Sequence, residues 1–239
     1  MNTSKDPIVV LVHGAWHGAW CWSSLQAELD TRGIPSLAID LPGHGVSLEP
    51  FGDLIADAAH VSLVLAKLAQ PVILVGHSYG GAVISQAGVT ATNVTHLVYL
   101  TAFVPDVGES VTSVLQSMPA APTALGAAIV LGEGGLSTIN PERARAAFYE
   151  HCNPAATPAN VARLCAQPFA TFMQALTAAA WHDIDSTYVR CTDDQAIALA
   201  HQDHMAQRCT HVETLATDHS PFASQPAQTA DILERIVRG

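Results

Sequence analysis

Basic residues are scarce in this sequence. Its 239 residues include 10 lysines and arginines against 21 aspartates and glutamates, so the formal net charge is −11. The only lysines are Lys5 and Lys67. Proteins that bind nucleic acid need a basic surface that neutralises phosphates. The charge balance therefore predicts that this chain does not bind nucleic acid.

Long apolar runs are also absent. A helix that spans a membrane needs about 18 or more consecutive apolar residues. The apolar runs here, such as IVVLV (8–12) and PVILV (71–75), are about five residues long, which is typical of buried strands. The first residues, MNTSKDP, contain no apolar stretch preceded by basic residues. We therefore expect neither a membrane segment nor a secretory signal.

Paired cysteines are missing as well. The five cysteines are scattered and form no CxxC motif; they are Cys21, Cys152, Cys165, Cys191 and Cys209. An odd, scattered set disfavours a disulfide framework and a structural zinc site. Because reduced cysteines are normal in the cytoplasm, we expect a cytoplasmic protein.

Short apolar runs alternate with helical patterns along the chain. Strands are predicted at 8–12, 35–41, 71–76, 94–100, 187–191 and 210–216. Helices are predicted between or after them, at 20–29, 53–68, 80–89, 196–207 and 226–237. Apolar strands separated by helices are typical of an α/β protein whose mostly parallel sheet carries helices on both faces.

Residues 104–186 interrupt this alternation. They are rich in alanine, proline and glycine, contain helical patterns and show no strand pattern. We expect a helical insertion that forms a cap over the carboxyl edge of the sheet, where open α/β sheets bind their ligands. The whole chain, 1–239, is then one α/β domain with a cap insertion at about 104–186.

One serine lies in a motif with a clear structural context. Gly76-His77-Ser78-Tyr79-Gly80 follows an apolar strand and precedes a helix of small residues, which is the setting in which G-x-S-x-G marks a nucleophile. The sharp turn needs glycine two residues before and two residues after the serine. The helix N-terminus beside the serine favours developing negative charge. The motif predicts Ser78 as a nucleophile.

A serine hydroxyl needs a base to become a good nucleophile. On this kind of sheet the order along the chain is serine, acid, histidine, with the histidine after the last strand. His219 fits that position. The acid should follow the strand before it, where Asp194 is preferred, and Asp193, Asp218 and Asp106 are alternatives. The acid would hold the histidine tautomer and stabilise the imidazolium.

The tetrahedral intermediate of acyl transfer needs two N–H donors for its oxyanion. One should be the backbone N–H of Tyr79, directly after the nucleophile. The other should come from the loop after the first strand, HGAW, at Ala15. We expect Gly14 to let the backbone turn so that this N–H points into the site. His13 is then expected to hold the loop and not to act as a base.

These segments together resemble the α/β-hydrolase superfamily, and within it the branch of plant methyl-ester esterases, plant hydroxynitrile lyases and small bacterial carboxylesterases. The matching segments are LVHGAWHGAWCW (11–22), DLPGHG (40–45), GHSYGG (76–81), YLTAFVPD (99–106), RCTDD (190–194) and DHSPF (218–222). The resemblance implies no metal or cofactor. It implies a site made of Ser78 as nucleophile, His219 as base, Asp194 as acid, and Ala15 and Tyr79 as oxyanion donors.

Two positions bear on the reaction. The hydroxynitrile lyases of this branch have a threonine after the first-loop histidine and a lysine after the catalytic histidine, where this chain has Gly14 and Ser220. Without a lysine ammonium to stabilise departing cyanide, lyase chemistry is disfavoured. We expect a serine carboxylesterase for small to medium, largely apolar esters, with pyrethroid-type, aryl and methyl esters as candidates. The alternatives are a hydroxynitrile lyase and a ligand-binding receptor with little turnover.

A small-molecule ester would need an apolar cavity beneath the cap. We expect its substrate-binding residues to be His13 and Gly14 from the first loop and, from the region of the insertion, Phe103, Met118, Phe148, Phe172 and Trp181. The protein is expected to act as a monomer or homodimer.

Overall fold

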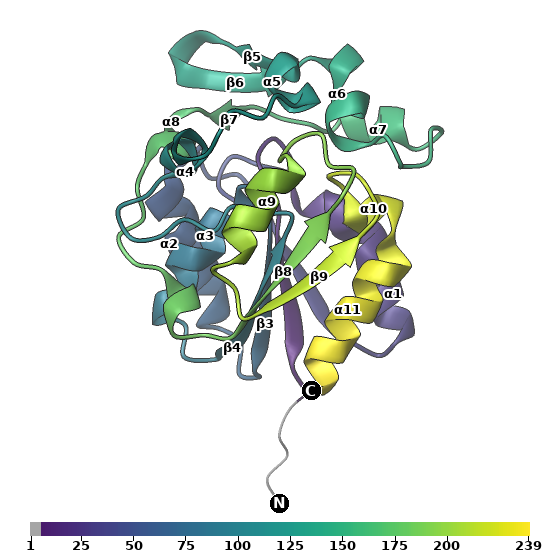
Figure 1. The fold of residues 1–239 in the computed structure, drawn as a ribbon. Coiled ribbons are helices and arrows are strands. Elements are labelled where there is room, and N and C mark those ends of the chain that lie inside the picture. Colours follow the sequence, from purple (N-terminus) through teal and green to yellow (C-terminus); the bar gives the residue numbers. More distant parts are fainter. Residues whose placement is uncertain (1–5) are drawn as a thin grey trace, which may run out of the picture.

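The computed structural model describes residues 6–239, and its centre is a six-stranded parallel sheet (Figure 1). The strands are β1 (Ile8–Val12), β2 (Ser36–Ile39), β3 (Val72–His77), β4 (Val94–Leu100), β8 (Ser186–Cys191) and β9 (His211–Leu215). Their spatial order is β2-β1-β3-β4-β8-β9, and each neighbouring pair is parallel. All six strands therefore present their carboxyl ends at one edge of the sheet.

Helices cover both faces of this sheet, as the apolar strands predicted. On one face lie α2 (Leu54–Leu65), α3 (Gly80–Ala87) and α9 (Leu199–Ala206). On the other lie α1 (Ser23–Thr31) and α11 (Pro226–Arg238), with the short α10 (Pro221–Ser224) before it. Alternate residues of β1 point to opposite faces, so Val10 joins the first core and Val9 the second. Every residue of β1 and of β3 is buried.

The predicted strands and helices are confirmed, with ends that differ by a few residues. The largest difference concerns the helix predicted at 20–29, which begins as a 3₁₀ turn, η1 (Ala19–Trp22), and continues as α1. Helix α2 begins at a capping residue, because the Asp53 carboxylate accepts a hydrogen bond of 2.8 Å from the Ala56 N–H. Short 3₁₀ turns also occur at η2 (Gly88–Thr90), η3 (Glu133–Gly135) and η4 (Ala180–His182).

The segment between β4 and β8 forms an insertion, residues 101–185. Its elements are α4 (Val111–Ser117), α5 (Ala124–Ala128), β5 (Ile129–Leu131), β6 (Leu136–Ile139), α6 (Pro141–Phe148), α7 (Thr157–Val161), β7 (Gln167–Pro168) and α8 (Ala170–Met173). The three strands form a separate antiparallel sheet, β5-β6-β7. The prediction of an insertion without strands is therefore wrong. These strands have only two to four residues, too few for a periodic pattern to be detected.

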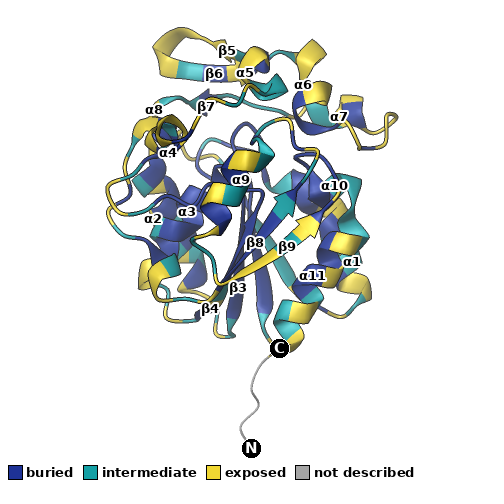
Figure 2. Ribbon diagram, viewed as in Figure 1, coloured by how far each residue is buried: buried dark blue, intermediate teal, exposed yellow. Residues whose placement is uncertain are grey.

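Most of the insertion lies over the carboxyl edge of the parallel sheet, at the top of Figure 1, and its last segment, in green, runs down beside the sheet to β8. Figure 2 shows exposed residues on the outward side of the insertion, while much of the chain between it and the sheet is buried. Of the helices in the described part of the chain, none has both the length and the apolar character that crossing a membrane requires.

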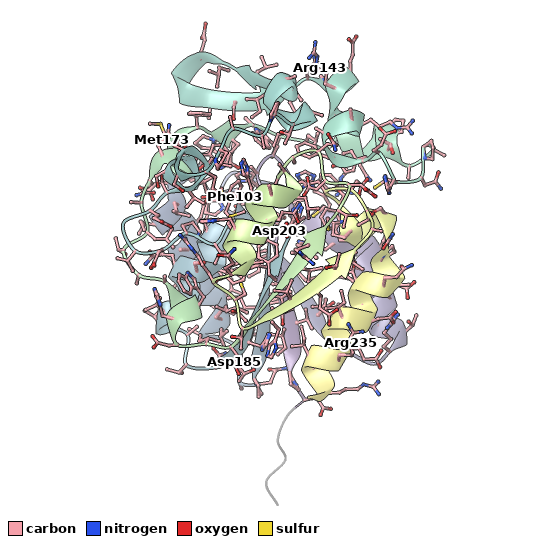
Figure 3. All side chains as sticks on the ribbon, in the orientation of Figure 1. Phe103, Arg143, Met173, Asp185, Asp203 and Arg235 are labelled. Carbon is pink, nitrogen blue, oxygen red and sulfur yellow. The ribbon has the colours of Figure 1, made fainter. Side chains whose placement is uncertain are left out.

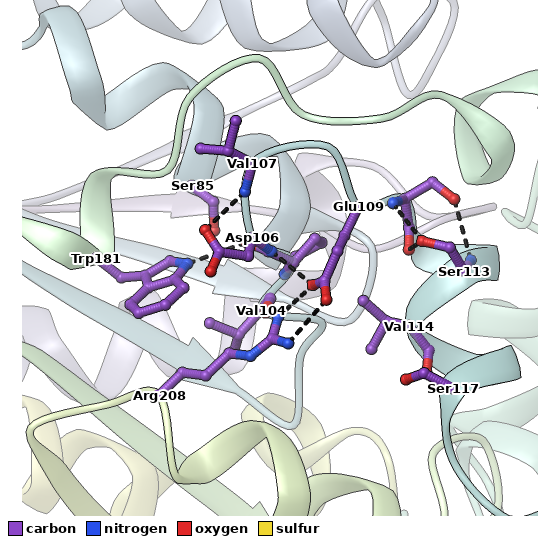
Figure 4. Close-up of polar contacts among 12 residues, drawn as sticks. Ser85, Val104, Asp106, Val107, Glu109, Ser113, Val114, Ser117, Trp181 and Arg208 are labelled. Atoms are coloured by element: carbon purple, nitrogen blue, oxygen red, sulfur yellow. Dashed lines mark hydrogen bonds and ion pairs between the residues drawn. The ribbon is translucent and has the colours of Figure 1, made fainter.

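The two ends of the insertion are joined at its root (Figure 4). Arg208 donates hydrogen bonds to the Val104 carbonyl at 2.7 Å and to the Glu109 carboxylate at 3.0 Å. The Trp181 indole N–H donates to the Pro105 carbonyl at 3.0 Å. These contacts tie the start of the insertion to its last turn and to the end of α9.

Candidate active site

Ser78 occupies a sharp turn between β3 and α3. Its φ of 53° lies in the left-handed region, which is uncommon for a residue other than glycine. A Cβ on Gly76 would lie 2.5 Å from the Gly80 carbonyl oxygen, and a Cβ on Gly80 would lie 2.6 Å from the Val12 carbonyl oxygen. Both positions therefore need glycine, as the motif predicted. The turn lifts Ser78, which is 8% exposed, to the edge of the sheet.

His219 and Asp194 form a buried hydrogen-bonded pair. His219 Nδ1 lies 2.7 Å from Asp194 Oδ2, and both side chains are almost completely shielded from solvent. Because the carboxylate accepts, Nδ1 carries the proton and Nε2 is left as a proton acceptor. The other carboxylate oxygen, Oδ1, accepts from the backbone N–H groups of Ala196 at 2.6 Å and Ile197 at 2.9 Å. The start of the loop after β8 thus orients the acid.

The other three aspartates considered as the acid have different partners. Asp193 points outward and lies 3.8 Å from the His151 ring. Asp218 accepts a hydrogen bond of 2.8 Å from the His151 backbone N–H. Asp106 pairs with His182 at the root of the insertion, at 2.7 Å. In the described structure the carboxylate that meets the His219 ring is that of Asp194.

His77, which the sequence did not single out, links the serine turn to the histidine loop. Its Nε2–H donates to the His219 carbonyl oxygen at 2.7 Å, and the centroids of the two rings are 4.5 Å apart. Burial, followed by the neighbouring histidines, lowers the pKa of His77 well below its usual value. The ring is therefore neutral. Its hydrogen bond to the His219 carbonyl holds the backbone of His219 next to the turn that carries Ser78.

Both histidines of the HGAWHGAW segment hold the loop after β1. His13 accepts from the Leu41 N–H at 3.1 Å and donates from Nδ1 to the Gly14 carbonyl at 2.8 Å. His17 donates from Nδ1 to the Ala15 carbonyl at 2.8 Å and lies 2.7 Å from the Tyr149 hydroxyl. Burial lowers the pKa of His17 to about 4 and that of His13 well below its usual value. His13 is therefore neutral, and its two hydrogen bonds hold the loop, which is the role expected for it.

Gly14 is needed for a different reason from the predicted one. The left-handed residue of this loop is Trp16, with φ of 63°, and not Gly14. A Cβ on Gly14 would lie 2.8 Å from both His77 Nδ1 and Ser78 Cβ. The glycine therefore lets the loop approach the serine turn closely, and the change of chain direction comes at Trp16.

A cavity of about 540 Å³ opens onto Ser78 and is bounded by the insertion. Ala15 and Trp16 line it from the first loop. Phe103, near the start of the insertion and labelled in Figure 3, lines the cavity too. None of the described residues that form the wall carries a charge, and the few polar ones are Ser78, Thr112 and Gln116. The cavity is thus suited to an uncharged, apolar molecule.

Three of the seven residues expected to bind substrate lie in the wall of this cavity. Phe103, Met118 and Phe172 line the cavity, whereas the following do not: His13, Gly14, Phe148 and Trp181. Phe148 packs instead between the rings of His17 and His219, at centroid distances of 5.3 Å and 5.8 Å. Trp181 is held at the root of the insertion by its bond to the Pro105 carbonyl. Both are aromatic residues of the insertion region, and their sequence alone does not show which way they point.

Several lining residues were missed by the sequence analysis. They are Trp16, Val111, Thr112, Leu115, Gln116, Ala120, Leu125, Ile129, Phe169, Ala196 and Ile197. Trp16 could have been predicted from the sequence, because it stands in the HGAW segment next to Ala15, a predicted oxyanion donor. The others lie in or beside the insertion, where short irregular elements leave no pattern that identifies the inner side.

The side chain of Tyr79 is hydrogen-bonded to a buried carboxyl group, that of Asp57. The Tyr79 phenol donates to Asp57 Oδ2 at 2.7 Å, and Asp57 Oδ1 has no hydrogen-bond partner among the described residues. Asp57 is 1% exposed. Burial is the largest cause that raises its pKa to about 7, while the Tyr79 bond acts in the opposite direction. Asp57 is therefore protonated in a large fraction of the molecules near neutral pH.

We expect the change Asp57→Asn to alter the pH dependence of stability. In the wild type the folded protein binds this proton more tightly than the unfolded chain, so stability falls as pH rises from about 4 to about 7. The limiting slope for one group is about 1.4 kcal/mol per pH unit. Asparagine does not titrate, so the variant should gain stability relative to the wild type as pH rises.

Urea unfolding of both proteins at about pH 5 and about pH 8 measures this difference. Asp30→Asn, at an exposed position on α1, is the matched control and should follow the wild type at both pH values. A constant difference in unfolding free energy between the Asp57→Asn variant and the wild type would contradict the prediction.

Known proteins match the chain, some of them over most of its length. Residues 9–232 match the alpha/beta hydrolase family. Alpha/beta hydrolase nvfD from Aspergillus novofumigatus is 29% identical over 247 residues, covering 97% of this chain and 95% of that protein. A carbendazim-hydrolysing esterase from Nocardioides is 42% identical over 111 residues, covering 44% and 46%. The structure of a pyrethroid hydrolase from Sphingobium faniae superposes with a TM-score of 0.86 at 24% identity, over 98% of both chains.

Proposed function

Since the chain belongs to the alpha/beta hydrolase family, we propose that it is a serine carboxylesterase for small to medium, largely apolar esters. The observation that carries this proposal is an uncharged cavity that opens onto Ser78, in a structure that also holds the buried His219–Asp194 pair. The likeness to an esterase that hydrolyses carbendazim supports the same reaction class. A cytoplasmic location and a monomeric or homodimeric state stay predictions from the sequence.

In the proposed reaction the Ser78 hydroxyl attacks the ester carbonyl, and His219 Nε2 takes its proton. The tetrahedral intermediate collapses, the C–O bond to the alcohol breaks, and His219 returns the proton to the departing alcohol. Water then attacks the acyl-enzyme with His219 again as base, which frees the carboxylic acid and restores Ser78. Asp194 holds the tautomer with the proton on Nδ1 and stabilises the imidazolium that forms in each half of the reaction.

The backbone N–H groups of Ala15 and Tyr79 are the proposed oxyanion donors. Among residues 6–239, neither group donates a hydrogen bond to another atom of the protein. Ala15 lines the cavity beside Ser78, and its carbonyl is held by His17. Donors that are already in place stabilise the developing oxyanion without reorganisation at the moment of reaction.

We assign the insertion the role of a cap that forms most of the acyl- or alcohol-binding wall. Val111, Leu115, Met118 and Phe172 line the cavity from it. Burying apolar substrate surface against such side chains contributes about 25 cal/mol per Å². An ester with a larger apolar group should therefore bind more tightly until the cavity is full.

Positions 14 and 220, which distinguish the hydroxynitrile lyases from the esterases, do not support the lyase alternative. Ser220 follows His219, so no ammonium group stands there, and its buried hydroxyl has no partner among the described residues. A side chain on Gly14 would collide with His77 and Ser78, so the loop does not accommodate the threonine of the lyases. Ester hydrolysis needs neither side chain.

A panel of p-nitrophenyl esters of increasing acyl length tests the proposal, with the Ser78→Ala protein as the blank. We expect kcat/KM to rise from acetate to butyrate and hexanoate as the acyl chain fills the apolar cavity. The matched pair is butyrate and hemisuccinate, which have acyl chains of equal length. The succinyl carboxylate would lose water without gaining a charged partner, so its kcat/KM should be at least about tenfold lower.

Activity confined to cyanohydrins would show that the protein is a lyase. Tight ligand binding with no turnover above the Ser78→Ala blank would show a receptor. Equal turnover of butyrate and hemisuccinate would contradict the assignment of the uncharged cavity as the substrate site.

A further inference from the structure

Thr101 lies at the point where the backbones of the serine turn and the acid loop come together. It follows β4 directly, is fully buried and has a φ of 39°. Its N–H donates to the Val189 carbonyl in β8 at 2.9 Å. Two residues later, the Phe103 N–H donates to the Ser78 carbonyl at 3.0 Å. One short stretch of chain is therefore bonded both to the strand that leads to Asp194 and to the nucleophile itself.

The conformation of Thr101 is strained. A left-handed φ crowds the side chain against the backbone, and a β-branched residue in this region is a genuine outlier. Glycine or asparagine would adopt the same backbone angles with less strain, but neither has a hydroxyl group. Strain of this kind persists where the surrounding structure holds a residue in place, and it is concentrated at functional sites.

The Thr101 hydroxyl donates a hydrogen bond to Asp194 Oδ2. The same oxygen accepts the proton of His219 Nδ1. The backbone N–H groups of Ala196 and Ile197 bind the other oxygen, Oδ1. Thr101 is therefore the only hydroxyl among the described donors to this carboxylate, and it acts on the oxygen that faces the histidine.

The two donors on Oδ1 restrain the position of that oxygen, but they do not prevent the carboxylate from rotating so that Oδ2 moves away from His219 Nδ1. A donor on Oδ2, fixed by a rigid turn, removes this freedom. We propose that Thr101 is a positioning residue, whose hydroxyl holds Oδ2 of Asp194 in line with Nδ1 of His219. The proposal rests on the proposed role of Ser78, His219 and Asp194 in acyl transfer, and it explains why a strained threonine occupies this turn.

Two variants at this position separate the hydroxyl from the shape of the side chain. Thr101→Val keeps the branched shape and removes the donor, whereas Thr101→Ser keeps the donor and removes a methyl group. Thr101→Ala removes both and is the substitute if the valine variant does not fold. In each protein the functional sites are counted by end-point labelling of Ser78 with a fluorophosphonate, and kcat is expressed per labelled site.

We expect Thr101→Val to lose about 10- to 100-fold in kcat per labelled site, the range for loss of one hydrogen bond to a charged group. KM should stay within about twofold, because Thr101 does not line the cavity. The low-field proton resonance of the His219–Asp194 hydrogen bond should shift or disappear. Thr101→Ser should keep the resonance and stay within about threefold of the wild-type kcat.

Three results would overturn the proposal. One is a valine variant with wild-type kcat per site and an unchanged resonance. Another is a serine variant that is as impaired as the valine variant. The third is a valine variant that merely has fewer labelled sites, with normal rate and resonance in those that remain, because a purely structural residue behaves in that way.

The proton resonance keeps this test independent of the substrate. If the wild type hydrolyses no ester but the resonance depends on the hydroxyl at position 101, the esterase proposal fails and the positioning role of Thr101 stands. If esters are hydrolysed and neither kcat per site nor the resonance responds to the loss of the hydroxyl, the esterase proposal stands and the role of Thr101 fails.

Discussion

Replacing Ser78 with alanine should abolish ester hydrolysis and leave the fold intact. The change removes the oxygen that is proposed to attack the ester, and in serine hydrolases the loss of the nucleophile lowers kcat by roughly 10⁵-fold or more. Alanine keeps the Cβ that the turn already accommodates at a φ of 53°, and the side chain faces the cavity. The unfolding free energy should therefore stay within about 1 kcal/mol of the wild-type value. Hydrolysis of p-nitrophenyl butyrate and urea unfolding measure the two quantities.

Ser85→Ala is the matched control for this prediction. Ser85 is a buried serine on α3, the helix that begins just after Ser78. Its hydroxyl donates to the Gly81 carbonyl at 2.8 Å and lies 2.8 Å from the Tyr99 hydroxyl, away from the cavity. This variant should lose stability but keep its turnover within a few-fold. If Ser78→Ala retained substantial turnover of the ester, Ser78 would not be the nucleophile.

Asp194→Asn should lower kcat by about 10⁴-fold. The asparagine amide can donate a hydrogen bond to His219 Nδ1, which would move the ring proton to Nε2, the nitrogen that is proposed to take the proton of Ser78. The carboxylate of Asp194 is buried and bonded to the ring at 2.7 Å, so water does not replace the lost charge. The side chains are nearly identical in shape, and the backbone donors of Ala196 and Ile197 can still bind the amide oxygen. The effect should therefore appear in kcat with little change in fold.

The neighbouring Asp193→Asn is the control, because it makes the same chemical change one residue away. Asp193 is about half exposed, and its carboxylate lies 3.8 Å from the His151 ring. Exposed pairs of this kind contribute little, so kcat should stay within about twofold of the wild-type value. Impaired turnover in the Asp193 variant together with normal turnover in the Asp194 variant would show that Asp193, and not Asp194, is the acid.

The parts of the molecule that the sequence predicted depend on short-range patterns. Apolar runs such as IVVLV are continuous because both faces of the sheet are covered, and here they indicated the buried strands. The turn that carries Ser78 was visible because glycine must stand two residues before and two residues after the serine, at Gly76 and Gly80, to avoid collisions with the backbone. His219 was identified by its place after the last strand, since parallel strands bring their carboxyl ends to the same edge.

The insertion was predicted less well because its elements are short. Strands of two to four residues pair only because the chain brings them together. They are too short for an alternating apolar pattern to predict a sheet. The direction of an aromatic side chain there depends on which neighbours it meets. Phe172 faces the cavity, whereas Phe148 packs against His17 and His219.

By itself, then, the sequence determined the parallel sheet, the turn that carries Ser78, the histidine after the last strand and the loop that approaches the serine. The tertiary structure decided which aspartate meets His219, because Asp193 and Asp194 share the same local pattern and differ only in which way the loop turns them. It also brought Thr101 to Asp194 and Asp57 to Tyr79. Those contacts join residues far apart in the chain, and a pattern of neighbouring residues carries no information about them.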